Sequence, residues 1–371
     1  MTGSTRPSTG SPPASDGRPT VALDCRWLSF SGAGRVTESL LRGLQVVAPP
    51  HRWVLWGPPE VAGHLWPGAE HALDTTDPRR LNGQRSWFAI PSANLVVFLH
   101  QQRPLRHVPA LTMVLDTTPL RYNRNRADAW AKRRFLRRVG SASEGILTIS
   151  DFSSRSIEAD LGIRADRIAK VGLPADRQLA ERILALRARS APEEVALYVG
   201  LFLPHKNLPR LIEAFGRTAF RRRGGRLLLV GGKDGAEPLR RSLDGDQRSY
   251  VTIRPSCTQP ELESLYATSR FLIQPSLEEG FGLPVQEALA AGLAACVSSG
   301  GALPEVTRGF AEHFDPTSVE AMAAAIDLTA GRAGDQTGDH GRSRAEAFLA
   351  ATPTITDLAN QVVDVVEQHL S

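Results

Sequence analysis

The chain has 371 residues, a net charge of +5 and 42% hydrophobic residues, and a length of this kind is typical of two domains. The apolar content excludes a chain that is disordered throughout, and the sequence lacks the run of about 18 apolar residues that a membrane span requires. Its three cysteines, Cys25, Cys257 and Cys296, are far apart, which excludes a disulfide scaffold or a cysteine-rich zinc module and fits a reducing compartment.

Residues 1–19 are dominated by Ser, Thr, Gly and Pro, and we expect this tail to be disordered. It lacks the apolar region of a secretory signal, so the sequence favours a cytoplasmic protein.

From residue 20 onward, short apolar runs alternate with amphipathic segments, which is the pattern of a parallel sheet covered by helices. In the first half, a strand at 20–23 leads to a glycine-containing loop at 31–34 and then to a helix. Further strands are expected at 53–56, 95–99, 111–115 and 146–149.

A charged segment at 181–194, broken by Pro192, is expected to be a linker, and strands and helices alternate again after it. Strands are expected at 195–199, 226–230, 251–253, 271–274 and 294–297. The pattern predicts an α/β protein with two domains, residues 20–180 and 195–352. A ligand cleft would lie between them, at the carboxyl ends of the strands. Residues 353–371 are expected to form a helix that crosses back to the first domain.

The most informative stretch is 274–292, which reads QPSLEEGFGLPVQEALAAG. A strand ends at Gln274-Pro275, a glycine-flanked loop follows, and a helix begins with Pro284 near its first position. Such a turn presents backbone N–H groups beside the positive end of a helix dipole, so it can hold a phosphate or sugar hydroxyls. Glu279 and Glu287 would accept hydrogen bonds from vicinal hydroxyls if they face one pocket, or would only complement the helix dipole if they do not.

This stretch resembles the signature of the family 4 glycosyltransferases, retaining enzymes of the GT-B fold, in which E-G-F-G-L-P-x-x-E closes the donor-sugar site. The resemblance covers about residues 20–330 and is stronger in the second half. It implies two Rossmann-like, doubly wound domains that face a central cleft, with the acceptor bound by the first and the nucleotide-sugar donor by the second. Further matching segments are 32–35, 148–153, 198–200, 206–208, 211–215, 228–232, 263–266 and 303–306.

The resemblance also implies residue roles. Glu287 would hydrogen-bond the ribose of the nucleotide, and Glu279 would contact the transferred sugar. Lys206 would neutralise the diphosphate leaving group, and lysine accounts for only four of the 44 basic residues. Gly32 and Gly34 would approach the diphosphate from the opposite domain. The other residues placed at the donor are Gly200, His205, Gly280, Phe281, Gly282 and Leu283.

Sugar transfer passes through an oxocarbenium-like centre while negative charge grows on the diphosphate, so fixed cations and donors supply much of the catalysis. In the family a lysine, an arginine and helix ends do this work, which implies no metal and no other cofactor. Asp244-Gly245-Asp246 has the shape of a metal-binding motif of another fold, but its polar, arginine-flanked setting predicts a surface turn.

Two positions depart from the family pattern. Leu115 stands where many members of the family have a histidine, directly before the retained Asp116. Leu201 directly follows Gly200, at a position where the family often has an arginine. His100 matches a frequent family histidine and would compensate, or would be a structural histidine at the end of a strand. The expected catalytic residues are Glu279, Lys206, Asp116 and His100.

The resulting hypothesis is a retaining glycosyltransferase of a mannosyltransferase-like subgroup. GDP-mannose or a related GDP-sugar is the favoured donor, with UDP- and dTDP-sugars open, and the acceptor would be a glycan, a lipid-linked or a small molecule. The alternatives are a catalytically impaired auxiliary subunit, motivated by Leu115 and Leu201, and a nucleotide-sugar epimerase of the GT-B fold.

Basic residues cluster on one predicted helix, at 132–134 and 137–138. This cluster would be a solvated face, or would contact an acidic acceptor or the anionic inner face of the membrane. Because no aromatic-interleaved motif accompanies the charge, we do not expect a nucleic-acid partner.

Overall fold

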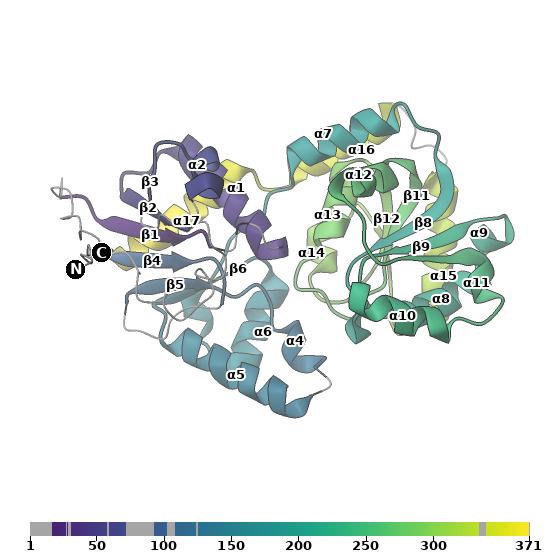
Figure 1. The fold of residues 1–371 in the computed structure, drawn as a ribbon, viewed down its shortest axis with the longest axis horizontal. Helices are drawn as coiled ribbons and strands as arrows, with labels where there is room; N and C mark the ends of the chain where they lie inside the picture. Colours follow the sequence, from purple (N-terminus) through teal and green to yellow (C-terminus); the bar gives the residue numbers. More distant parts are fainter. Residues whose placement is uncertain are drawn as a thin grey trace, which may run out of the picture.

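The computed structural model of the protein describes residues 17–71 except 27, 29, 30 and 58, together with residues 93–101, 108–123, 125–333 and 339–370. Most of the tail that the sequence predicts to be disordered lies outside the described residues. The described chain forms two α/β domains side by side (Figure 1).

The first domain is built on a parallel sheet with the strand order β3-β2-β1-β4-β5-β6-β7. Its strands are β1 (Thr20–Asp24), β2 (Arg52–Trp56), β3 (Glu70–His71), β4 (Leu95–Phe98), β5 (Ala110–Met113), β6 (Gly145–Thr148) and β7 (Ile168–Lys170). The associated helices are α1 (Ser31–Val47), α2 (Pro59–Leu65), α4 (Thr118–Arg121), α5 (Arg126–Ser141) and α6 (Asp151–Leu161).

Helices cover both faces of this sheet. Alternate strand residues such as Val21 and Leu23 pack against α1 and α17 (Ile355–Leu370), whereas Ala22 belongs to a cluster on the opposite face. Ile146 of β6 packs beneath α5 and α6. The central strands are therefore apolar at nearly every position, as a parallel sheet buried on both sides requires.

The second domain has a parallel sheet with the order β10-β9-β8-β11-β12-β13. Its strands are β8 (Glu193–Val199), β9 (Arg226–Val230), β10 (Val251–Arg254), β11 (Ser269–Gln274), β12 (Ala294–Ser298) and β13 (Glu312–Phe314). The helices are α7 (Arg177–Arg187), α8 (Leu208–Arg217), α9 (Ala219–Arg222), α10 (Lys233–Ser242), α11 (Gln247–Tyr250), α12 (Gln259–Thr268), α13 (Leu283–Ala290), α14 (Leu303–Thr307), α15 (Val319–Arg332) and α16 (Asp339–Ala351).

Both sheets share one topology. In each, the first strand lies between its second and fourth strands, so the strand order reverses direction there. In doubly wound sheets, ligands bind at this reversal, outside the carboxyl ends of the strands. For the second domain the reversal lies between β8 and β11, and the two loops that follow these strands run from 200 to 206 and from 275 to 282.

The segment 181–194, expected to be a linker, is instead the second half of α7 and the start of β8. Ile183 is fully buried in a cluster with Tyr266 of α12 and Leu289 of α13, so α7 belongs to the second domain. The chain crosses earlier, between Leu173, which packs in the first domain, and Ala175, which packs in the second. Charged residues on the exposed face of α7 conceal the helical spacing of its apolar residues.

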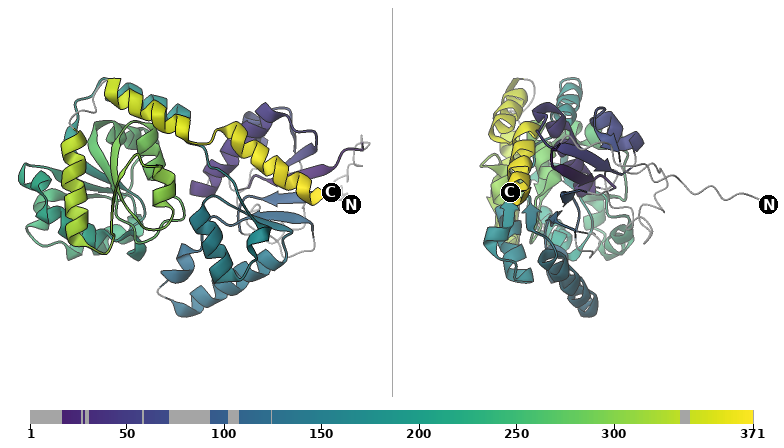
Figure 2. Two further views of the ribbon diagram at one scale, coloured as in Figure 1. Left: turned by 180° about the vertical axis from the view of Figure 1, so that it is seen from behind. Right: turned by 90° about the vertical axis from the view of Figure 1, so that its left-hand side faces the viewer.

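A second crossing lies between α16 and α17. Phe348 of α16 packs in the second domain, whereas Leu358 and Val362 of α17 pack in the first. Gly43 on α1 permits the close approach of the two helices, because a Cβ there would overlap the carbonyl of Ile355. Figure 2 shows α17 lying along the first domain beside α1.

Candidate functional site

A buried ion pair occupies the predicted ligand-binding edge of the second sheet. Lys206 ends a single helical turn after β8, and Glu279 lies in the loop between β11 and α13. The ammonium of Lys206 contacts both carboxylate oxygens of Glu279, at 2.6 and 2.7 Å. Their side chains are only 14% and 11% exposed. The two loops at the reversal of strand order are thus joined by their charged residues.

Neutral donors complete the surroundings of Glu279. Gln274 Nε2 and Ser276 Oγ each donate to Oε1 at 2.7 Å. Burial alone would raise the pKa of Glu279, but the charge of Lys206 and these hydrogen bonds outweigh it and hold the pKa below its ordinary value. Glu279 is therefore an anion held beside a cation.

The glycines of the loop are required by its geometry. Gly282, directly before α13, has a φ of +108°, which residues with a Cβ rarely adopt. A Cβ on Gly280 would overlap the side chain of Asp116, which belongs to the first domain. The loop therefore lies against the opposite domain without space for side chains at this point.

Asp116 lies at the edge of the first domain that faces the loop, next to Gly280. Its side chain accepts a hydrogen bond from the backbone of Thr118 at 3.0 Å. Burial raises the pKa of Asp116, and the negative charges of Glu279 and Glu278 raise it further. The hydrogen bond from Thr118 and the positive charge of Lys206 lower it, but they do not outweigh burial. Asp116 is thus brought together with Lys206 and Glu279 across the domain junction.

His205 also lies at the junction. Its ring is buried. The centroid of the ring lies 5.3 Å from that of Tyr122 in the first domain. Its carbonyl accepts a hydrogen bond from the backbone of Leu277 at 2.7 Å, which ties the loop after β8 to the loop after β11. Burial and the neighbouring charge of Lys206 lower the pKa of His205 despite the nearby Glu279 and Glu278, which favours the neutral ring.

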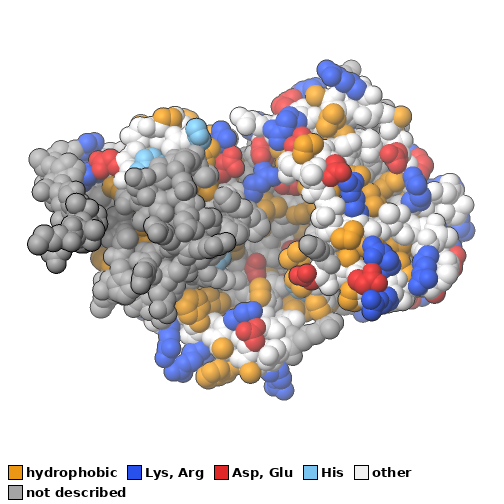
Figure 3. Space-filling view, in the orientation of Figure 1, with side chains coloured by type: hydrophobic (Ala, Val, Ile, Leu, Met, Phe, Trp, Pro, Cys, Tyr) orange, Lys and Arg blue, Asp and Glu red, His pale blue; other side chains and the backbone are white. Residues whose placement is uncertain are grey.

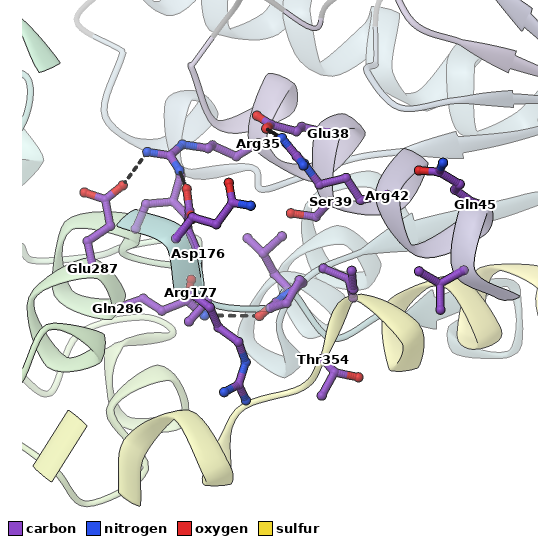
Figure 4. A pocket seen from close by; sticks show the side chains of 17 residues that line it. Arg35, Glu38, Ser39, Arg42, Gln45, Asp176, Arg177, Gln286, Glu287 and Thr354 are labelled. Carbon is purple, nitrogen blue, oxygen red and sulfur yellow. Dashed lines mark hydrogen bonds and ion pairs between the residues drawn. The ribbon is translucent and has the colours of Figure 1, made fainter. Parts of the chain in front are cut away.

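Glu287, in the second turn of α13, accepts hydrogen bonds on both oxygens. Tyr266 Oη donates to Oε2 at 3.0 Å. Arg35 Nη2 donates to Oε1 at 3.1 Å, as Figure 4 shows. Burial raises the pKa of Glu287, although Arg35 and Tyr266 act in the opposite direction. Arg35 belongs to α1 of the first domain, so this carboxylate too is reached from both domains.

The glycine segment 31–34 was expected to be a loop, and it forms the first turn of α1 instead. Gly32 lies beside Leu283 at the start of α13, so it does approach the second domain, and Gly34 is buried within the helix. Gly200 turns the chain after β8, where Tyr198 Oη donates to the carbonyl of Leu201 at 2.9 Å.

His100 has a different electrostatic environment. Burial lowers its pKa, and the charges acting on it are those of Asp24 and Arg26 in the first domain. Arg26 donates to both oxygens of Asp24, at 2.8 and 2.7 Å, and lies 4.0 Å from the centre of the Trp56 ring. A catalytic role of His100 stays a prediction.

Glu278 was not singled out from the sequence, and it too contacts the first domain. Its carboxylate accepts hydrogen bonds from Thr118 Oγ1 at 2.7 Å and from Arg121 Nε at 3.0 Å. Arg121 also pairs with Asp160 of α6. Arg35, Tyr266 and Arg121 were likewise missed as contributors, because their importance depends on how the two domains meet.

The two departures from the family pattern have apolar consequences. Leu115 packs against the core of the first domain, as do Phe281 and Leu283 from the second. Leu201 is 60% exposed. These positions add an apolar contact and an exposed apolar side chain where the resemblance predicts polar groups.

The described residues also bear on metal binding and on membrane insertion. Across this part of the chain, no group of three or more His, Cys, Asp or Glu side chains is placed to hold a metal ion. Asp244 and Asp246 are exposed, and Asp244 accepts a hydrogen bond from the backbone of Gln247. No helix in the described ranges has the length and apolar character that crossing a membrane requires.

The basic helix predicted from the sequence is α5. It carries Trp130, which is 64% exposed, with the guanidinium of Arg134 5.7 Å from the centre of its ring. Figure 3 shows basic and hydrophobic side chains together at the lower edge of the first domain, over this helix, and a hollow between the two domains.

Comparison with known proteins identifies the second domain. Residues 185–330 match the family model described as glycosyl transferases group 1. The second domain belongs to the group 1 glycosyltransferases. The chain is 33% identical to the O-antigen chain mannosyltransferase B of Escherichia coli over 190 residues, which cover 49% of this chain and 50% of that protein. The MMP alpha-(1->4)-mannosyltransferase of Mycolicibacterium hassiacum is 27% identical over 242 residues, covering 63% and 56%. The chain thus matches about half the length of these relatives.

Solved structures extend the similarity to both domains. HepE of Anabaena in complex with UDP and glucose has a TM-score of 0.68 at 14% identity, covering 94% of this chain and 99% of that one. A glycosyltransferase of Rickettsia africae has a TM-score of 0.65 at 14% identity, covering 95% and 99%. The fold is GT-B, which confirms the predicted fold class. The predicted family is confirmed for the second domain.

Proposed function

We propose that the protein is a retaining, metal-independent glycosyltransferase that moves a hexose from a nucleotide sugar to an acceptor. The observation that carries this proposal is the buried Lys206–Glu279 pair at the reversal of strand order in a group 1 domain. A cation fixed at this edge suits a diphosphate leaving group, and the adjoining carboxylate suits sugar hydroxyls.

Lys206 is the group that stabilises the leaving group. Its ammonium has three N–H donors and Glu279 takes at most two, so one remains for a phosphate oxygen. Because the ammonium is already buried and oriented, little reorganisation is required as charge develops on the diphosphate. Asp116 adds a carboxyl on the opposite side of the junction, at the domain that would bind the acceptor.

GDP-mannose or a related GDP-sugar is the proposed donor. The mannosyltransferases of Escherichia coli and Mycolicibacterium hassiacum named above support a mannosyl donor. The acceptor would be a glycan, a lipid-linked or a small molecule. The exposed Trp130 among the basic residues of α5 supports peripheral contact with an anionic membrane, where a lipid-linked acceptor would be presented.

The test begins with the donor. Thermal unfolding is measured with GDP, UDP, dTDP and ADP and their mannose or glucose conjugates, because a ligand at about 100 times its Kd stabilises by about 2.7 kcal/mol. We expect GDP and GDP-mannose to stabilise the protein most. Turnover is then measured with the donor that stabilises the protein and with acceptors of the three classes, in the presence of EDTA to remove metal ions. NMR of the product should show that the transferred sugar keeps the anomeric configuration it had in the donor.

Two outcomes would favour the alternatives. The apolar Leu115 and the exposed Leu201 motivate an auxiliary subunit, and a protein that no nucleotide stabilises would favour that function. Inversion at a sugar carbon in the absence of any acceptor would favour an epimerase. Loss of turnover in EDTA, restored by a divalent cation, would contradict metal independence.

A further inference from the structure

The carboxylate of Glu287 is bound by an arginine from the opposite domain. Arg35 lies one turn into α1, and its guanidinium donates through Nη2 to Glu287 Oε1 at 3.1 Å and through Nη1 to Asp176 Oδ2 at 2.5 Å (Figure 4). Asp176 lies directly after the first crossing between the domains. One planar guanidinium therefore joins the first domain, the crossing segment and the second domain.

Glu287 keeps capacity for further hydrogen bonds. A carboxylate has about four lone-pair sites, and the structure gives Glu287 one hydrogen bond on each oxygen, from Arg35 and from Tyr266. Each oxygen can therefore accept one more. Two such acceptors on one carboxylate match the two O–H donors of a vicinal diol, the group that a ribose presents.

The surroundings provide space for a ligand. A cavity of about 410 Å³ lies between α1, the crossing segment, α13 and the start of α17, and both Arg35 and Glu287 line it. The Glu287 side chain is 13% exposed and that of Arg35 is 29% exposed. The ion pair is thus sheltered enough to hold a fixed geometry yet open at one side.

We propose that Arg35 is a positioning residue for the ribose of the nucleotide: it holds the Glu287 carboxylate in the orientation that receives the 2′- and 3′-hydroxyls. This inference rests on the proposed function, in which Glu287 binds the ribose. Since Arg35 reaches Glu287 only when the two domains are together, the ribose site is complete only in the closed arrangement.

The geometry requires arginine. A guanidinium presents its N–H donors in a rigid planar fork, so Nη1 and Nη2 reach two carboxylates at once. A lysine at position 35 would supply the charge from a flexible stem and a single nitrogen. Asp176 fixes the other end of the fork while its Oδ1 accepts the backbone N–H of Leu179 at the start of α7.

Isothermal titration calorimetry with GDP and 2′-deoxy-GDP tests this role. The full chain is compared with Arg35→Lys, Arg35→Ala and Asp176→Asn, the last of which retains the helix cap. For Arg35→Ala we expect GDP affinity to fall about tenfold, the size of losing one hydrogen bond to a charged group. The affinity for 2′-deoxy-GDP should fall less, so the preference for ribose shrinks. Arg35→Lys should not restore it, and Asp176→Asn should reduce it by a smaller factor.

Arg164→Ala is the control. Arg164 also belongs to the first domain and pairs with a carboxylate, that of Asp166, but it does not line the cavity. The Arg164→Ala chain should bind both nucleotides as the unchanged chain does. An Arg35→Lys chain that melts like the unchanged chain and keeps the full ribose preference would overturn the role of Arg35 and leave the proposed function intact. An unchanged chain that binds none of the nucleotides would contradict the proposed function and this inference together.

Discussion

At the scale of single residues, the side chains of Glu279 and Glu287 have similar exposure, 11% and 13%, yet their pKa values shift in opposite directions. Burial raises both. Glu279 has a lysine in direct contact and two neutral donors, which together outweigh burial. Glu287 shares its one arginine with Asp176 and gains a single hydroxyl, which is not enough. The partners therefore decide how readily each carboxylate ionises.

Removing Lys206 should abolish most turnover. We expect Lys206→Ala to lower kcat by roughly 10²-fold or more, because it removes the cation that would stabilise the diphosphate. The measurement is steady-state turnover at saturating donor. Lys170→Ala, which removes a half-exposed lysine that pairs with Asp151, is the control. A Lys206→Ala chain with unchanged kcat would contradict the site assignment.

Replacing Glu279 should change how stability depends on pH. Because the pKa of Glu279 is lowered below its ordinary 4.5, its ionised form stabilises the fold above that pH, and this contribution is lost as pH falls toward the folded-state pKa. We expect Glu279→Gln to melt at a lower temperature than the unchanged chain at pH 7, with a difference that narrows below about pH 4.5. Melting curves between pH 3 and 7 measure this, and a difference that widens on acidification would contradict it.

At the scale of elements, the sequence predicts the long buried strands well and the domain boundary poorly. β1, β4, β8 and β11 each contain a continuous run of at least three apolar residues, which is consistent with a buried parallel strand. β3, β7 and β13 have only two or three residues each and were not predicted. The predicted domain boundary was wrong because the charged residues and the proline in 181–194 suggested a linker, although Ile183 in this segment is fully buried.

The site could be predicted only where one segment of sequence carries it. Glu279, Glu287 and the glycines between them lie on one loop and helix, and Lys206 lies in a second matching segment. The arginines that bind Glu287 and Glu278 come from the opposite domain, 252 and 157 residues away along the chain. No local pattern encodes such a contact, since it depends on how two separately folded sheets meet.

A helix that is part of a core should not tolerate cavities. We expect Ile183→Ala in α7 to destabilise the protein by about 2–5 kcal/mol, the usual cost of deleting a buried isoleucine side chain down to alanine. Leu186→Ala, on the same helix but 38% exposed, should cost clearly less. Urea unfolding measures both. Equal, small effects would mean that this segment behaves as a linker.

At the scale of the whole molecule, several polar contacts between the two domains gather at the loop that carries Glu279. Ser150 Oγ and Ser153 Oγ of the first domain donate to the carbonyl of Gly280 at 2.8 and 3.2 Å. Glu278 is bound by Thr118 and Arg121. The loop that carries Glu279 is therefore shaped by both domains.

Loosening that junction should favour an open arrangement. We expect Arg121→Ala to shift the ratio of open to closed molecules by roughly tenfold, because it removes charged hydrogen bonds to Glu278. Small-angle X-ray scattering should show a larger radius of gyration that nucleotide reduces. Arg217→Ala, whose ion pairs with Glu213 and Glu320 stay within the second domain, is the control. Identical scattering from both variants and the unchanged chain would contradict this role.

The position of α17 has a consequence for the order in which the protein is made. Domains generally fold from the N-terminus as the ribosome delivers them. Here the apolar face of α1, with Leu40 and Leu44, is covered by Leu358, Val362 and Val366, which emerge after the entire second domain. The first domain is therefore translated first but completed last. The apolar face of α1 stays uncovered until the second domain and α17 have been synthesised.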